Sequence, residues 1–184
     1  MRIDRLELEG FRNYVQESAD FDPGCNVICG ENAQGKTNLL EAIGYLSRGR
    51  SPRARTDREM IGFQEETARL TAQVYSRKRE FQVQADLFRG RRRKITVNQV
   101  PIKTSAALGD VYHTVLFQPE DLYLIREGAA ARRRFLDTAL CQLRPRYAAA
   151  LSGYERARNK RPGFSGTLIS IPACWRLCRS SMSR

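Results

Sequence analysis

The feature that most constrains this chain is a run of eight residues near its N-terminus. The run matches G-x-x-x-x-G-K-[ST], the pattern of a phosphate-binding loop. Its glycines let the backbone curl until successive N–H groups point at phosphate oxygens. The lysine is expected to reach the β- and γ-phosphates of a nucleotide, and the threonine hydroxyl to ligate Mg²⁺. The sequence therefore predicts a nucleotide site made of Gly30, Glu31, Asn32, Ala33, Gln34, Gly35, Lys36 and Thr37.

The residues on either side of the loop have the character that the loop requires. Residues 26–29, Asn-Val-Ile-Cys, are a short apolar run suited to a central parallel strand. Residues 38–46 follow the loop and read as an amphipathic helix. Its apolar face is expected to carry Leu39, Leu40, Ile43 and Leu46. We therefore expect an α/β fold in which the loop joins a buried strand to a helix.

Two further strands are expected before the loop. Residues 3–9 alternate strictly between apolar and charged side chains, as a half-buried strand does, and residues 15–21 form a second extended run. A simple kinase would more often have the phosphate loop after its first strand. Two strands ahead of the phosphate-loop strand therefore indicate a mixed sheet.

Three alternating segments after the helix, at 70–75, 80–88 and 95–98, predict an antiparallel meander with a basic hairpin tip. A charged turn is usually just solvated. The chain carries a net charge of +12, however, and such a charge suggests a polyanionic partner. Phosphate contact by this tip is therefore the other interpretation, and its candidate residues are Arg89, Arg91, Arg92, Arg93 and Lys94.

The C-terminal third of the chain is expected to be helical and then to change character. Residues 115–118 predict a strand, Pro119 is suited to the first turn of a helix, and 129–160 read as helical with a break at Pro145. A second group of candidate DNA contacts lies in this helical region: Arg132, Arg133 and Arg134.

The chain is expected to have three parts. The first is the N-terminal part of an ATPase lobe at 1–118, and the second is the start of a helical lobe at 119–160. Residues 161–184 contain no acidic residue and no helical or strand period. We interpret them as a divergent tail, either disordered or translated out of frame.

The cysteines and the N-terminus bear on compartment and metal binding. Five cysteines and one histidine lack the paired spacings of a zinc site, so no metal–cysteine site is expected. The N-terminus lacks the apolar core of a signal peptide, and no apolar run approaches the roughly 20 residues that span a bilayer. A cytoplasmic location is therefore expected.

Taken together, the segments at 6–14, 30–43, 115–122 and 132–137 resemble the RecF family of bacterial DNA replication and repair ATPases. The resemblance covers residues 1–160 in the family's order. It implies a P-loop NTPase of ABC-type head architecture that binds ATP and Mg²⁺ and forms an ATP-dependent homodimer. It also implies binding to duplex DNA near single-strand gaps and, with RecO and RecR, assistance in loading RecA. No membrane is implied.

The resemblance also bears on catalysis. It implies that Gln118 lies where such heads place a glutamine that senses Mg²⁺ and the γ-phosphate, although the residue reads equally well as a polar strand end. ABC-type heads also need a Leu-Ser-x-Gly-Gln-like signature and an apolar strand that ends in an acidic pair. Neither motif is legible, since residues 46–49 carry part of a signature in the wrong place and residues 122–125 are followed by Arg126. We expect a truncated RecF-type chain that binds ATP but cannot hydrolyse it.

Two other functions stay open at this point. One is a P-loop small-molecule kinase, with the arginine-rich segment 47–56 as its lid. The other is a non-catalytic nucleic-acid-binding fragment. The two strands before the loop and the hairpin arginines favour the RecF type over the kinase. Nucleotide-dependent DNA binding would separate the RecF type from the fragment.

Overall fold

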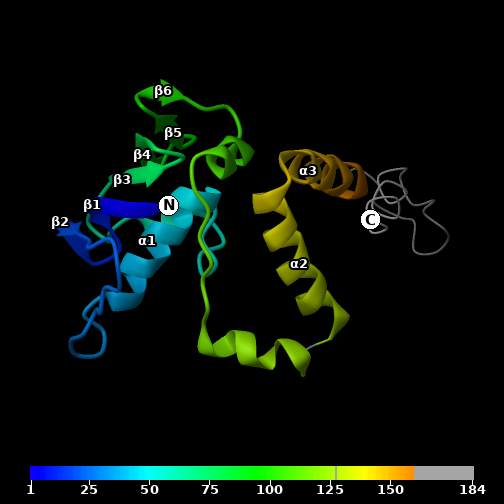
Figure 1. Cartoon of the computed structure of the whole chain (residues 1–184), viewed down its shortest axis with the longest axis horizontal. Helices are drawn as coiled ribbons and strands as arrows, with labels where there is room; N and C mark the ends of the chain where they lie inside the picture. The colour runs from blue at the N-terminus through cyan, green and yellow to red at the C-terminus, as the bar shows by residue number, and fades with distance from the viewer. Residues whose placement is uncertain (127, 160–184) are drawn as a thin grey trace. The chain divides into compact units, whose positions relative to one another are not determined.

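The computed structural model describes residues 1–126 and 128–159, so the tail predicted at 161–184 lies outside the described residues. The chain forms two compact units, 1–149 and 150–184, and the phosphate loop and the sheet belong to the first (Figure 1). The strands are β1 (Arg2–Phe11), β2 (Tyr14–Asp20), β3 (Thr67–Ser76), β4 (Arg79–Phe88), β5 (Lys94–Val97) and β6 (Val100–Pro101). The helices are α1 (Lys36–Arg48), α2 (Ala129–Leu143) and α3 (Pro145–Asn159), with 3₁₀ helices η1 (Asp57–Met60), η2 (Ser105–Asp110) and η3 (Pro119–Ile125).

The strands form one six-stranded sheet in the order β2-β1-β3-β4-β5-β6, and every neighbouring pair is antiparallel. The two strands before the loop and the meander after it are thereby confirmed. The segment between β2 and β3 holds the phosphate loop and α1, and β3 then returns to pair with β1. The phosphate loop therefore lies on a segment that leaves the sheet at β2 and re-enters it at β3, on the other side of β1.

The core lies between the sheet and α1, which crosses one face of the sheet (Figure 1). The strand register aligns apolar residues of that face in rows, because side chains alternate between the two faces of a strand. In one row Leu8 pairs with Leu70 and Leu70 with Ala85, and all three are buried. Alternation in the sequence therefore identifies which side of each strand meets the helix.

The buried face of α1 differs from the face that the sequence predicts. Leu39 and Leu46 are buried as expected, but the side chain of Leu40 is 43% exposed. Ala42 and Tyr45 take its place in the core. Tyr45 can bury its ring in the core because its hydroxyl keeps a hydrogen bond to Asp57. The buried stripe of the helix is therefore centred on residues 39, 42 and 46.

Two predicted strands are wrong. Residues 26–29 and 115–118 belong to no strand, and within the described part of the chain the sheet contains no parallel pair. Val27 is 82% exposed and Val115 fully exposed. A strand requires a second strand beside it to satisfy its backbone N–H and C=O groups, and a short apolar run does not supply that neighbour.

The predicted helices are confirmed. Pro119 begins η3, which is a 3₁₀ helix, and the long helical region is divided into α2 and α3 at Pro145. Proline is suited to the first position of α3 because its missing N–H would have no intrahelical acceptor there. None of the helices that can be described combines enough length and apolar character to cross a bilayer.

The two leucines of α1 provide a test of the observed helix face. Leu46→Ala is expected to lower the free energy of unfolding by about 2–5 kcal/mol, because it leaves a cavity in the core. Leu40→Ala should lower it by less than about 1 kcal/mol, because that side chain is partly solvated already. Urea unfolding followed by circular dichroism measures both. Equal losses would show that α1 packs as the sequence predicts.

Candidate nucleotide-binding site

The phosphate loop ends at the N-terminus of α1. Gly35 caps the helix with φ of 104°, a left-handed conformation that glycine adopts without strain. The first N–H groups of a helix have no intrahelical acceptors, and the helix dipole is positive there. The first turn of α1 contains no acidic residue. This end of the helix is therefore suited to an anion.

Lys36 lies folded over the loop that precedes it. Its Nζ donates to the carbonyl oxygens of Gly30, at 2.8 Å, and Glu31, at 2.5 Å. The loop is closed further by the side chain of Gln34, whose Oε1 accepts from the N–H of Glu31 at 3.0 Å. Within the described residues, no carboxylate forms a salt bridge with the Lys36 ammonium. No carboxylate among these residues therefore competes with an anionic ligand for the ammonium.

The turn between β1 and β2 lies directly against Gly35. A Cβ atom on Gly35 would come within 2.7 Å of Nδ2 and 2.8 Å of Oδ1 of Asn13, and within 2.9 Å of the Tyr14 hydroxyl. Real Cβ atoms do not approach that closely. Gly35 is required for two reasons, its positive φ and the close approach of this turn.

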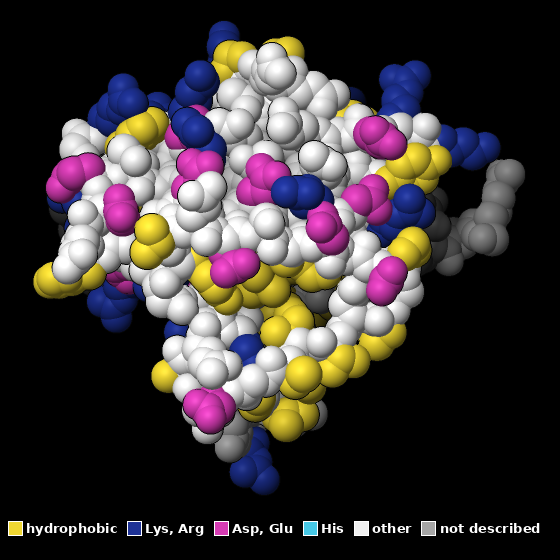
Figure 2. All heavy atoms as spheres, turned by 90° about the vertical axis from the view of Figure 1, so that its left-hand side faces the viewer, with side chains coloured by type: hydrophobic (Ala, Val, Ile, Leu, Met, Phe, Trp, Pro, Cys, Tyr) yellow, Lys and Arg dark blue, Asp and Glu magenta, His cyan; other side chains and the backbone are white. Residues whose placement is uncertain are grey.

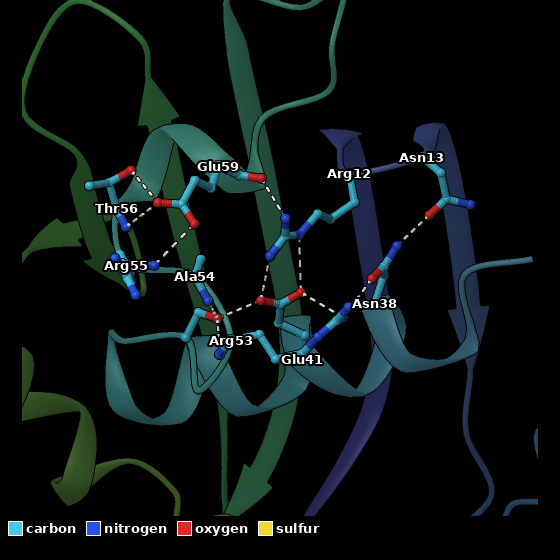
Figure 3. A network of polar contacts seen from close by, with 10 residues as sticks. Arg12, Asn13, Asn38, Glu41, Arg53, Ala54, Arg55, Thr56 and Glu59 are labelled. Atoms are coloured by element: carbon cyan, nitrogen blue, oxygen red, sulfur yellow. Dashed lines mark hydrogen bonds and ion pairs between the residues drawn. The ribbon is translucent and has the colours of Figure 1, made fainter. Parts of the chain in front are cut away.

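Beside the loop, α1 carries a buried carboxylate on its inner side, as Figure 3 shows. The side chain of Glu41 is 1% exposed. Arg12 donates to it twice, from Nε at 3.1 Å and from a terminal nitrogen at 2.8 Å. The Ser51 hydroxyl donates to it as well, and Arg53 approaches to 3.4 Å. A buried charge is tolerated when it is paired and hydrogen-bonded in this way.

The same contacts fix the basic segment after α1. The Arg12 guanidinium donates to the carbonyl of Glu59 at 2.6 Å, and the hydroxyl of Ser51 accepts from the N–H groups of Arg53 and Ala54. Glu59 forms a capping box with Thr56, and backbone and side-chain hydrogen bonds from 55 and 56 lower the pKa of its carboxyl. The segment that the kinase hypothesis uses as a lid is held against α1 by these bonds.

The basic residues of the hairpin are of two kinds: some are bound to protein groups and others are exposed. Arg89 donates to the backbone carbonyls of Glu65, at 2.6 Å, and Gly62, at 2.7 Å. Arg93 forms an ion pair with Asp57 at 3.1 Å. The remaining three candidates, Arg91, Arg92 and Lys94, are exposed at the tip. The guanidinium carbon of Arg91 lies over the ring of Phe88, 3.7 Å from the ring centroid.

The base of this hairpin is connected to α1 through Tyr45. The Tyr45 hydroxyl donates to Asp57 at 3.1 Å and accepts from Arg93 at 3.0 Å. Burial of the ring raises the pKa of Tyr45 well above its ordinary value, so the hydroxyl stays protonated and can donate.

The remaining predicted site residues lie elsewhere in the first unit. Gln118 precedes η3, where its backbone N–H donates to the carboxylate of Asp121 at 2.8 Å. Arg132, Arg133 and Arg134 are exposed in the first half of α2. The structure thus does not join these residues to the loop by any contact described above. It does bring residues 30–37 together with Arg12, Asn13 and the basic segment 50–56.

Three residues of this arrangement have no individual role in the sequence analysis: Arg12, Asn13 and Glu41. One signal for them is present in the sequence. Glu41 is a charged residue within an apolar run, Leu-Leu-Glu-Ala-Ile at 39–43, and the structure places it on the buried side of α1. A charge in that position indicates a buried partner.

Comparison with known proteins gives the same assignment for sequence and for structure. A family model described as an AAA domain matches residues 5–129. A curated relative from Lachnoclostridium phytofermentans, named DNA replication and repair protein RecF, is 35% identical over 181 residues, which are 95% of this chain and 50% of the relative. A second, from Leifsonia xyli subsp. xyli and of the same name, is 42% identical over 88% of this chain and 42% of its own length.

Among solved structures, the recombination mediator protein RecF with ATPrS matches with a TM-score of 0.80 at 32% identity, over 84% of this chain and 42% of that one. An ABC-type head is therefore shown as the fold, with an antiparallel sheet in place of the predicted mixed one. The chain spans about half the length of the curated relatives that it matches.

The buried carboxylate provides a stability test. Glu41→Gln is expected to lower the free energy of unfolding by roughly 2–4 kcal/mol, because it leaves the Arg12 guanidinium partly buried without its counter-charge. The matched control is Glu9→Gln, which removes an exposed pair with Arg69 and should cost less than about 1 kcal/mol. Chemical denaturation measures both. An equal loss of unfolding free energy in the control would show that the burial of Glu41 does not increase its contribution to stability.

Proposed function

The chain belongs to the AAA domain family and is homologous to RecF, and on that basis we propose that it is the ATP-binding part of a RecF-type DNA replication and repair protein. One observation carries the nucleotide assignment. The Lys36 ammonium lies at the acid-free N-terminus of α1, and its hydrogen bonds within the described part of the chain go to carbonyls of the loop that a phosphate chain would occupy. That loop is residues 30–37, and ATP is the ligand.

Mg²⁺ would accompany the nucleotide. The hydroxyl of Thr37, an exposed residue in the first turn of α1, is the ligand that the chain offers beside the loop. Mg²⁺ keeps several waters and is otherwise bound by the substrate phosphates, so few protein ligands are needed. Gln118 is proposed as the second protein group that senses the metal and the γ-phosphate.

DNA is the proposed macromolecular partner. Figure 2 shows acidic side chains interspersed with lysine and arginine on the face that it presents, so the net charge by itself does not identify a phosphate contact. At the hairpin tip, Arg91, Arg92 and Lys94 are exposed, whereas Arg89 and Arg93 are bound to protein groups. The tip is therefore proposed as the phosphate contact, with Arg132–Arg134 as a second one.

The wider role is proposed by homology. A RecF-type protein would form an ATP-dependent homodimer, bind duplex DNA near single-strand gaps in the cytoplasm, and assist RecA loading with RecO and RecR. The chain itself is proposed to bind ATP without turnover. Phosphoryl transfer to water depends on positioned acidic and signature groups, and the sequence contains neither motif.

The nucleotide site is tested by Lys36→Ala, with Lys103→Ala as a control that removes an equal charge from an exposed position away from the loop. Calorimetric titration with ATP and Mg²⁺ should show binding by the wild type and the control. Affinity should fall at least about ten-fold in Lys36→Ala, because the loop loses its cation. Unchanged affinity would contradict the assignment. Phosphate release should equal that of Lys36→Ala with or without DNA.

DNA contact by the hairpin tip is tested by replacing Arg91, Arg92 and Lys94 with Gln. The slope of log K against log salt for duplex DNA should become shallower by about one unit per lost contact. The matched control replaces Arg77, Lys78 and Arg79, which lie exposed around the turn between β3 and β4 and carry the same total charge. An equal change in both variants would indicate a general charge effect and no specific contact.

A further inference from the structure

A relay of side-chain hydrogen bonds reaches the phosphate loop from outside the motif, and Figure 3 shows its links among Asn13, Asn38 and Arg53. Nδ2 of Asn13, in the turn between β1 and β2, donates to the backbone carbonyl of Gln34 at 3.2 Å. Nδ2 of Asn38 donates to Oδ1 of Asn13 at 2.8 Å, and a terminal nitrogen of Arg53 donates to Oδ1 of Asn38 at 2.9 Å. The relay connects three segments that lie far apart in the sequence.

The relay sets the direction of the Asn13 amide. A side-chain amide has one acceptor oxygen and one donor nitrogen. The oxygen of Asn13 is taken by the donor of Asn38, and the oxygen of Asn38 is taken by a guanidinium that can only donate. The NH₂ group of Asn13 is thereby directed to the loop. A rotation of either amide by 180° would place donor against donor.

This contact in turn sets the direction of a loop N–H. The Gln34 carbonyl and the Gly35 N–H belong to one peptide plane, and in a trans peptide they point in opposite directions. The bond from Asn13 holds the carbonyl toward the β1–β2 turn. The Gly35 N–H therefore points away from that turn. If this peptide were free to rotate, phosphate binding would have to fix it and would cost conformational entropy.

We propose that Asn13 is a positioning residue for the nucleotide: it holds the Gln34–Gly35 peptide in the orientation that presents the Gly35 N–H to a phosphate oxygen. Asn38 and Arg53 act through Asn13 by orienting its amide. The inference rests on the proposed function, because the ligand of the loop is the triphosphate of ATP. It adds a residue outside the motif to that site and assigns it no direct contact with the ligand.

The experiment compares wild type, Asn13→Ala and a matched control, Asn26→Ala. Asn26 also makes two hydrogen bonds, both with the backbone of Asp22 in its own turn. Each protein is labelled with ¹⁵N-glycine, and the Gly35 amide resonance is recorded without nucleotide and during titration with ATP and Mg²⁺. Lys36→Ala serves as the reference for a lost nucleotide site.

The expected result has two parts. In Asn13→Ala the Gly35 resonance should shift or broaden before nucleotide is added, and the dissociation constant for ATP should rise by about three- to ten-fold, the equivalent of one hydrogen bond. Asn26→Ala should leave both unchanged. Asn38→Ala, which keeps Asn13 but removes the donor that orients it, should give a smaller change in the same direction.

The outcomes separate the two proposals. If the wild type binds ATP and Asn13→Ala has a wild-type Gly35 resonance and affinity, the positioning role is wrong and the proposed function stands. An equal loss in Asn26→Ala would overturn it too, because the effect would then come from general destabilisation. If the wild type gives no titration at all, the proposed function itself fails.

Discussion

The arrangement around the phosphate loop depends on a single buried carboxylate. Glu41 lies on the inner side of α1, and a charge there must find counter-charges or the helix cannot pack. Its partners come from the end of β1 and from the segment that follows α1, at Arg12, Ser51 and Arg53. These partners also hold Asn38 and the carbonyl of Glu59. One desolvated charge thereby fixes three segments against the helix that carries the loop.

The helix α1 connects the two proposed binding surfaces. Its N-terminus forms the end of the phosphate loop, and Tyr45, in its third turn, meets Asp57 and Arg93 at the base of the basic hairpin. The sheet supplies the frame, because β3 pairs with β1 on one side and with β4 on the other. The hairpin and the loop are therefore held by the same core although about sixty residues separate them in the sequence.

Net charge is a weak guide to which arginines can bind nucleic acid. The excess of 12 positive charges is a property of composition. In the structure, Arg12 and Arg53 neutralise a buried carboxylate and Arg89 and Arg93 bind protein groups. A guanidinium with five donors is well suited to such structural work. The arginines available for phosphate are a subset that only the packing defines.

The sequence by itself determined the loop, the helix after it, the strands β1 to β5 and the family. Each of these depends on local pattern: a spacing of glycines, an alternation of apolar residues, or a block of consecutive residues. The sequence failed at 26–29 and 115–118, because an apolar run does not say whether another strand lies beside it. It also placed Leu40 in the core, since a helical period allows neighbouring stripes and only the sheet selects one. Tertiary structure alone decided the partners of Glu41 and the contact of Asn13 with the loop. The bond of Arg12 to Glu41 and the bond of Asn13 to Gln34 each join residues more than twenty positions apart. No local pattern encodes which of many polar side chains will meet when the chain packs.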